Sequence, residues 1–205
     1  MKFLLDIEHG KSLNNINVLY PEITNKRLNT IPEGFFRIDD NGALDSPRHC
    51  YVHDHVLEFL WKNHHNYFEN VLCGDFAISP DFTVYLDAPL VLAVYQVWRS
   101  RSIARFWQEN GVFVIPTIHW SRTEINEHLF KGLENCEVVA IRTAKKGSEK
   151  AWLDAVLQFQ EMIKPKLVLQ FGTSKGIGAW KVCEVLNVNV GNRSWILNKK
   201  NLTLK

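Results

Sequence analysis

Apolar residues follow two patterns along the chain. One is a helical spacing, and the other is a continuous run that is typical of a buried strand. Between about residues 53 and 67, Val56, Leu57, Leu60 and Trp61 return at helical spacing. The continuous apolar run at 112–118 is typical of a strand that is buried on both faces. The pattern predicts helices at about 53–67, 88–109, 124–132, 148–163 and 175–186, and strands at 71–77, 112–118, 137–142, 167–171 and 188–190.

This alternation of helices and short strands favours an α/β fold with a mainly parallel sheet. About five strands are predicted, or six with one from the N-terminal region. A closed eight-stranded barrel normally takes about 250 residues, whereas this chain has 205. We therefore expect an incomplete TIM-like barrel or an open wound sheet, within a single domain that spans residues 1–205.

The first 50 residues carry most of the turn-forming sequence, including Tyr20-Pro21 and Ser46-Pro47. Asp40-Asn41-Gly42 predicts a small hairpin that joins residues 35–38 to residues 43–44. No long periodic segment occurs in this region. We expect an irregular N-terminal cap, residues 1–50, folded onto the rest of the domain.

Composition indicates a packed globular protein, because 46% of the residues are hydrophobic and 12% are aromatic. No apolar run reaches the roughly 18 residues that a membrane helix needs, and Asp6 interrupts the opening apolar segment too early for a signal peptide. The four cysteines are scattered, which is typical of reduced thiols in a cytosol. We expect a cytoplasmic protein with no membrane partner.

Charge is distributed unevenly along the chain, although the formal net charge is only +2. Residues 143–205 hold eleven basic and four acidic side chains. Such an asymmetry can mark a basic face for nucleic acid or for a host protein, in which Arg193, Lys199 and Lys200 would take part. The alternative is a solvated surface decorated with lysines.

Polar residues follow several predicted strands, where parallel α/β folds bind their ligands. These positions hold Asp75, Ser79, Asp81, His119, Trp120, Arg142, Thr143, Gly172, Thr173 and Ser174. We expect Asp75 or Asp81 and His119 to transfer protons, with Arg142 and Trp120 in the substrate site. The alternative is that these residues are polar only because the chain turns there.

The long helix predicted at 88–109 has an apolar stripe that continues into Arg101 and Gln108. An arginine suits the bidentate binding of a carboxylate or phosphate, so Arg99, Arg101 and Gln108 are candidate substrate-binding residues. The alternative is structural: these side chains, together with Asp81 or Asp87, would fix the turn against the helix.

Residues 172–178, Gly-Thr-Ser-Lys-Gly-Ile-Gly, form a glycine-rich turn between a predicted strand and a predicted helix. Such a turn can bind phosphate through backbone N–H groups, so Gly172, Thr173 and Ser174 are candidate phosphate contacts. The spacing is similar to the nucleotide loop of short-chain dehydrogenases, but it comes too late in the chain, and no Tyr-x-x-x-Lys pair is present. The G-K-[S/T] ending of a Walker loop is also absent, and we expect no cofactor.

A group of potential metal ligands, His49, Cys50, His53, Asp54 and His55, lies within seven residues. Its spacing matches neither a zinc finger nor H-E-x-x-H. Surface or helix-capping roles are favoured, and no metal site is predicted.

One block of sequence resembles a known family. It consists of Ser79-Pro80-Asp81-Phe82-Thr83, Asp87-Ala88-Pro89, Trp98-Arg99-Ser100-Arg101, Gln108-Glu109-Asn110-Gly111 and Val114-Ile115-Pro116-Thr117-Ile118-His119-Trp120. The pattern resembles the bacterial and phage domain-of-unknown-function family 4417, over roughly residues 50–175. Thr83 stands where the family usually has Ser, and Ala88 where it usually has Met. The resemblance implies a phage or mobile-element setting and no agreed activity.

The sequence therefore predicts a small cytoplasmic α/β protein of phage or mobile-element type. The first hypothesis is an enzyme that binds an anionic, phosphate-bearing ligand beyond the carboxyl ends of its strands. The second is a non-catalytic protein that binds a host protein or nucleic acid through a basic C-terminal face.

Overall fold

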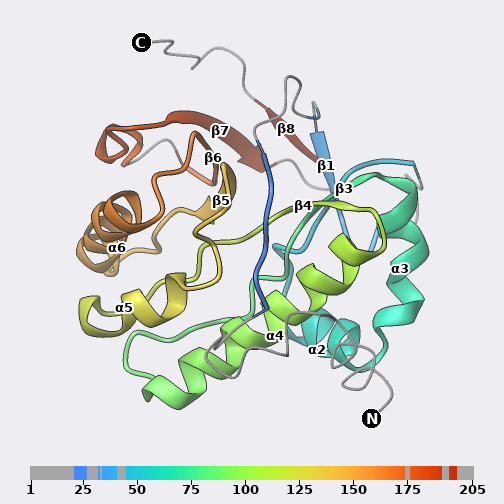
Figure 1. Ribbon diagram of the computed structural model, residues 1–205, viewed down its shortest axis with the longest axis horizontal. Coiled ribbons are helices and arrows are strands. Elements are labelled where there is room, and N and C mark those ends of the chain that lie inside the picture. The colour runs from blue at the N-terminus through green and yellow to red at the C-terminus, as the bar shows by residue number, and fades with distance from the viewer. Residues whose placement is uncertain are drawn as a thin grey trace.

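The computed structural model describes residues 21–26, 32, 34–40, 45–173, 176–190 and 194–197. These residues form one curved sheet with helices outside it (Figure 1). The strands are β1 (Gly34–Arg37), β2 (Arg48–His49), β3 (Phe76–Ile78), β4 (Phe113–Ile115), β5 (Val138–Arg142), β6 (Leu167–Phe171), β7 (Glu184–Val190) and β8 (Ser194–Leu197). The helices are α2 (Asp54–Lys62), α3 (His64–Cys73), α4 (Leu90–Glu109), α5 (Thr123–Phe130), α6 (Glu149–Met162) and the short 3-10 helix η2 (Ile177–Ala179).

The sheet consists of two parallel runs that an antiparallel strand joins. Its strand order is β4-β3-β2-β1-β8-β7-β6-β5. Strands β1 to β4 are parallel to one another, as are β5 to β7, and β8 pairs antiparallel with both β1 and β7. The predicted α/β class with a mainly parallel sheet is confirmed.

The two edge strands, β4 and β5, approach each other without a continuous ladder, and we call the gap between them the seam. Just beyond β4, Thr117 forms an isolated parallel bridge with Ala140 of β5. The N–H of Ile118 donates to the carbonyl of Ala140 at 2.8 Å, and the N–H of Ala140 donates to the carbonyl of Pro116 at 2.9 Å. The sheet is therefore an incomplete barrel, one of the two architectures that the sequence predicts.

A single asparagine joins the seam at its amino end. The amide nitrogen of Asn25 donates to the carbonyls of Val114, at 2.9 Å, and Val138, at 2.8 Å. Its amide oxygen accepts from the N–H of Val138 at 2.9 Å. Asn25 is buried. Its side chain thus supplies hydrogen bonds that a strand would otherwise provide between β4 and β5.

Two apolar layers hold this architecture together. The inner layer fills the barrel with side chains from the strands and the residues that follow them: Phe35, Tyr51, Ile78, Ile115, Val138, Ala140, Leu167, Leu169, Phe171 and Val188. The outer layer packs the opposite strand faces against the helices, and Val139 and Ile141 of β5 belong to it. Since successive strand residues face opposite sides, both layers require apolar residues, which explains the continuous apolar runs.

Three predicted elements differ from the structure. The helix predicted at 53–67 is two helices, α2 and α3, which meet at Asn63. The strand predicted at 71–77 begins only at Phe76, because α3 continues to Cys73. The helix predicted at 175–186 is replaced by η2 and the first part of β7. In β7 the sequence Glu-Val-Leu-Asn-Val-Asn-Val alternates with a period close to two, and pairing with β6 and β8 stabilises the strand.

The N-terminal region contributes to the sheet itself. Strands β1 and β2, both from the segment expected to form an irregular cap, lie inside the strand order. The neighbours of β1 are β2 and β8, and the hairpin predicted across Asn41-Gly42 falls on residues that the structure does not describe. Residues 41–44 lie outside the described part of the chain.

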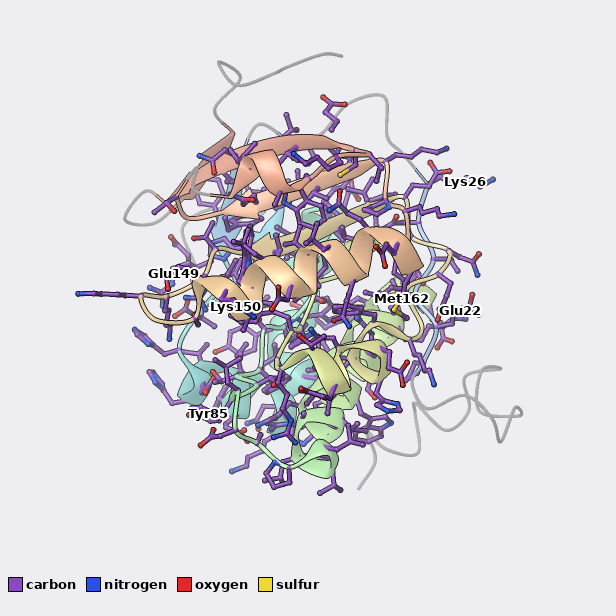
Figure 2. All side chains as sticks on the ribbon, turned by 90° about the vertical axis from the view of Figure 1, so that its left-hand side faces the viewer. Glu22, Lys26, Tyr85, Glu149, Lys150 and Met162 are labelled. Atoms are coloured by element: carbon purple, nitrogen blue, oxygen red, sulfur yellow. The ribbon has the colours of Figure 1, made fainter. Side chains whose placement is uncertain are left out.

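The two ends of the barrel are visible in Figure 2. Tyr85 and Glu149, which follow β3 and β5, lie toward one side of the molecule, and Glu22, Lys26 and Met162 lie toward the other. The loop residues that follow β2, β3, β4 and β5 form what we call the carboxyl-end rim. None of the helices in the described segments has the length and apolar character needed to cross a membrane.

Candidate functional site

Side chains from four strand ends meet at the carboxyl-end rim. Asp81 follows β3, His119 follows β4, Arg142 ends β5 and Tyr51 follows β2. A guanidinium nitrogen of Arg142 donates to Oδ2 of Asp81 at 3.1 Å, and Nε2 of His119 lies 4.0 Å from Oδ1 of Asp81. The Arg142 guanidinium lies over the Tyr51 ring, 5.7 Å from its centroid. Three of the predicted site residues, Asp81, His119 and Arg142, are therefore neighbours.

Buried hydroxyl groups fix the two loops that carry Asp81 and His119. The N–H of Thr117 donates to Oγ of Ser79 at 2.8 Å, and its hydroxyl donates to the Ser79 carbonyl at 2.9 Å. From α4, the hydroxyl of Ser100 donates to the carbonyl of Pro80 at 2.6 Å. The fully buried guanidinium of Arg101 donates to the carbonyl of Thr117 at 3.3 Å. Arg101 thus contacts the backbone that positions His119.

Burial controls the charges of Asp81 and His119. Burial raises the pKa of Asp81, while the charge and hydrogen bond of Arg142 act in the opposite direction. Burial lowers the pKa of His119 to about 3, with a further contribution from the positive charge of Arg101. A hydrogen bond with the backbone of Thr117 acts in the opposite direction and is the smallest of the three contributions. His119 is therefore neutral at pH 7. Of the two groups, Asp81 is the one suited to exchange a proton.

Two residues of the site were not predicted there: Tyr51 is not among the sequence-based candidates, and His49 is among them only as a potential metal ligand. The Tyr51 ring packs against Phe171 with centroids 4.7 Å apart, and its hydroxyl lies 3.4 Å from Oγ1 of Thr117. Burial raises the pKa of Tyr51 well above its usual value and lowers the pKa of His49 to about 3. His49 belongs to β2 and Tyr51 follows it. This strand has only two residues and gives no periodic signal in the sequence.

Asp75 lies at the opposite end of the barrel from Asp81. It precedes β3, and its carbonyl accepts from the N–H of Phe113, the first residue of β4, at 2.8 Å. The preceding residue, Gly74, ends α3 against the backbone of Ser46, where a Cβ would overlap the Ser46 carbonyl. Asp75 is therefore not part of the group formed by Asp81, His119 and Arg142.

Arg99 and Gln108 have structural partners other than Asp81. Arg99 forms an ion pair with Glu58 at 2.6 Å and stacks on the Phe82 ring, 3.9 Å from its centroid, which joins α4 to α2. The Gln108 amide bonds the backbone of Thr24. The predicted network of Asp81, Arg99, Arg101 and Gln108 is thus divided, because Asp81 pairs with Arg142. Trp120, beside His119, is partly buried against the outer apolar layer.

The glycine-rich turn begins at the end of β6, and the N–H groups of Gly172 and Thr173 already have partners. The N–H of Gly172 donates to the carbonyl of Val188 at 3.3 Å, and that of Thr173 donates to Oγ1 of Thr143 at 3.2 Å. Ser174 lies outside the described residues. The expected long helix is replaced by η2, which has three residues, so no extended helix N-terminus faces this turn.

Close packing explains two of the glycines. Gly172 has φ 112°, and a Cβ there would overlap the hydroxyl of Thr143. Gly176 has φ 78°, and a Cβ there would overlap the ring of Trp152 on α6. The glycine spacing of this turn therefore follows from backbone conformation and packing.

We expect Gly176→Ala to destabilise the protein by about 2–4 kcal/mol, because it combines a left-handed backbone with overpacking against Trp152. Gly178→Ala is the matched control: a Cβ there meets no atom within 4 Å, and the expected change is within about 0.5 kcal/mol. Urea unfolding of the two variants compares these values. Equal stability of both variants would contradict the packing explanation.

The histidines of the 49–55 segment lie in two different environments. His49 lies buried inside the barrel, whereas His53 and His55 are exposed and stack on each other with centroids 5.8 Å apart. Across the described segments, no group of three or more His, Cys, Asp or Glu side chains is placed to hold a metal ion.

The chain is similar to proteins from mycobacteriophages. It is 30% identical to the "Gene 1 protein" of Mycobacterium phage D29 over 137 residues, which cover 64% of this chain and 48% of that protein. It is 26% identical to the "Gene 1 protein" of Mycobacterium phage L5 over 137 residues, which cover 65% of this chain and 58% of that protein. The chain thus spans about half the length of these relatives.

No solved structure matches the chain. The model of the family described as "Domain of unknown function (DUF4417)" matches residues 23–189. This range includes every element from β1 to β6 and the whole group of Asp81, His119 and Arg142. The chain therefore belongs to the family described as domain of unknown function DUF4417.

Proposed function

We propose that the protein is a small cytoplasmic enzyme that binds an anionic, phosphate-bearing ligand at the carboxyl-end rim and transfers a proton there through Asp81. The observation that carries this proposal is the ion pair between Asp81 and Arg142, which joins a largely buried carboxylate to a half-exposed guanidinium. Arg142 can contact a ligand that arrives from solvent, and Asp81 can hold a proton in a site shielded from water.

Arg142 is suited to bind the anion. Its side chain is 46% exposed, and a guanidinium can donate two parallel hydrogen bonds to a phosphate or carboxylate. Lys145, three residues along the same loop, adds positive charge close enough to lower the pKa of Asp81. These two cations favour a ligand with more than one negative charge.

Asp81 is suited to proton transfer, because general acids and bases work best when their pKa lies nearer to the working pH. Burial moves the pKa of Asp81 in that direction. His119 is neutral, so it can offer Asp81 either a donor or an acceptor without adding charge. Arg101 maintains this state through its charge and holds the adjoining backbone at Thr117.

The alternative hypothesis, a basic face for nucleic acid or a host protein, depends on Arg193, Lys199 and Lys200. These residues lie outside the described part of the chain, so the hypothesis stays a prediction from the sequence.

A thermal-shift screen with nucleotides, sugar phosphates and short DNA and RNA tests the proposed function. A phosphorylated small molecule is expected to raise the melting temperature of the natural protein, because a ligand that binds only the folded state stabilises it. The shift should be lost in Arg142→Ala and kept in Arg122→Ala, which removes an exposed arginine just after the His119 loop. A shift that survives in Arg142→Ala, or a response to nucleic acid alone, would contradict the proposal.

Turnover of the ligand found in that screen then tests the role of Asp81. Asp81→Asn keeps the shape of the side chain but cannot accept a proton, so activity is expected to fall at least about 100-fold while binding persists. An Asp81→Asn protein that retains full turnover would remove Asp81 from the mechanism.

A further inference from the structure

The guanidinium that we propose as the anion-binding group is already occupied in the free protein. Arg142 donates to Oδ2 of Asp81 at 3.1 Å. The Asp81 side chain is 19% exposed and the Arg142 side chain is 46% exposed, so an anion that arrives from solvent meets the guanidinium first. An anion bound there would lie close to the negative charge of Asp81.

From this geometry we infer that Asp81 is an internal competitor for Arg142, and that anion binding at the rim is coupled to the uptake of one proton by Asp81. This inference rests on the proposed function, and it names the regulation of the same site. The ligand class is a doubly charged oxyanion, such as a phosphate ester, which is strong enough to displace a carboxylate from the guanidinium.

The groups that surround Asp81 determine how its carboxylate responds when Arg142 moves to the ligand. Those that face it are Arg142 at the end of β5, Lys145 from the loop after β5, Asp54 from α2, His119 from the loop after β4 and Tyr51 from the loop after β2. In the free protein the charge and hydrogen bond of Arg142 oppose the effect of burial on the pKa of Asp81. Once the bound anion takes that hydrogen bond and offsets that charge, burial and the repulsion from Asp54 favour the protonated acid.

In this exchange the Asp81 carboxylate takes up the proton. The hydrogen bond between Arg142 and Oδ2 of Asp81 breaks, a hydrogen bond between Arg142 and the anion forms, and a proton from solvent binds the Asp81 carboxylate. Nε2 of His119 is 4.0 Å from Oδ1 of Asp81. A protonated Asp81 can donate to this nitrogen after a small side-chain movement. The buried imidazole then gains a hydrogen bond with Asp81.

Calorimetry with sulfate as the probe tests this inference, because sulfate is a dianion that does not titrate near neutral pH. Titrations at pH 6 to 8, in buffers of different ionisation enthalpy, measure both affinity and proton uptake. For the natural protein we expect uptake approaching one proton per sulfate and an affinity that falls as the pH rises. Asp81→Asn is expected to bind sulfate about tenfold more tightly at pH 7.5, with no proton uptake.

Asp87→Asn is the matched control, since Asp87 is an exposed carboxylate on the same loop and its replacement changes the net charge equally. It should bind sulfate as the natural protein does, whereas Arg142→Ala should not bind it. Equal sulfate affinity in Asp81→Asn and the natural protein, without proton uptake, would overturn the inference and leave the proposed anion site standing. Absence of sulfate binding to both proteins would overturn the inference and the anion site together. Melting temperatures of the variants establish that each is folded.

Discussion

Lowering the pH from 7 to 4.5 is expected to reduce the free energy of unfolding by up to about 5 kcal/mol, owing to His49 and His119. Both imidazoles are buried, and burial lowers the pKa of each to about 3. In the unfolded chain a histidine titrates near pH 6.5, so the unfolded state binds more protons between these two values. The stabilisation is therefore complete above pH 6.5 and is lost as the pH falls toward 3. Each histidine contributes about 1.4 kcal/mol per pH unit in this range.

Asp81 acts in the opposite direction, because burial raises its pKa and the folded state takes up a proton there more readily than the unfolded state. It offsets a part of the loss at low pH. Urea unfolding at several pH values between 7 and 4.5 measures the net slope, and His119→Asn should reduce that slope by about half. His128→Asn, at a half-exposed position on α5, should leave it unchanged.

Nuclear magnetic resonance of the natural protein gives an independent measurement. The imidazole of His119 is expected to stay neutral down to about pH 4. A stability profile that is flat between pH 6.5 and 4.5, together with a His119 resonance that titrates near 6.5, would show that this imidazole is accessible to water in the folded protein.

The second large effect is expected at Asn25, where Asn25→Ala should destabilise the protein by about 4 kcal/mol. The substitution removes two side-chain donors and one acceptor that are buried between β4 and β5. It leaves the carbonyls of Val114 and Val138 and the N–H of Val138 without these partners. Each unsatisfied buried group costs about 1–3 kcal/mol. The seam has no continuous ladder that could compensate.

Urea unfolding compares this variant with two others. Asn25→Asp keeps the acceptor for Val138 but replaces the donors with an oxygen that faces two carbonyls, so it should be at least as destabilising as the alanine variant. Asn110→Ala, which removes an exposed bond to the carbonyl of Phe106, should cost less than about 1 kcal/mol. A loss below about 1 kcal/mol in Asn25→Ala would show that the seam does not depend on this side chain.

Long periodic segments and apolar runs made much of the fold predictable. The strand predicted at 167–171 coincides with β6, and the long helix predicted at 88–109 begins two residues before α4 and ends with it. Both elements pack an apolar face against a layer of the core, which imposes a regular pattern on their sequences. By contrast, β2 has two residues, and its place beside β1 and β3 depends on tertiary pairing alone.

The candidate site was predictable where its residues follow the carboxyl ends of parallel strands, because ligands of parallel α/β folds bind there. Asp81, His119 and Arg142 follow or end parallel strands, and the structure brings them together. Asp75 does not join them, because α3 extends to Cys73 and β3 begins after Asp75. Tyr51 was not predicted as a site residue, because its position depends on β2, which is too short to be recognised in the sequence. The glycines of the 172–178 turn have a second explanation that the sequence did not reveal, because close packing against Thr143 and Trp152 favours glycine at positions 172 and 176.

The position of β8 bears on how the chain folds as it is synthesised. Within the described part of the chain this strand comes last, yet it lies between β1 and β7 and joins the two parallel runs of the sheet (Figure 1). Until the ribosome has released residues 194–197, β1 and β7 each expose an unpaired edge. Unpaired edges are templates for aggregation. Translation products that stop before β8 should therefore be recovered in the insoluble fraction and cleared by proteases, even though they carry every residue of the proposed site.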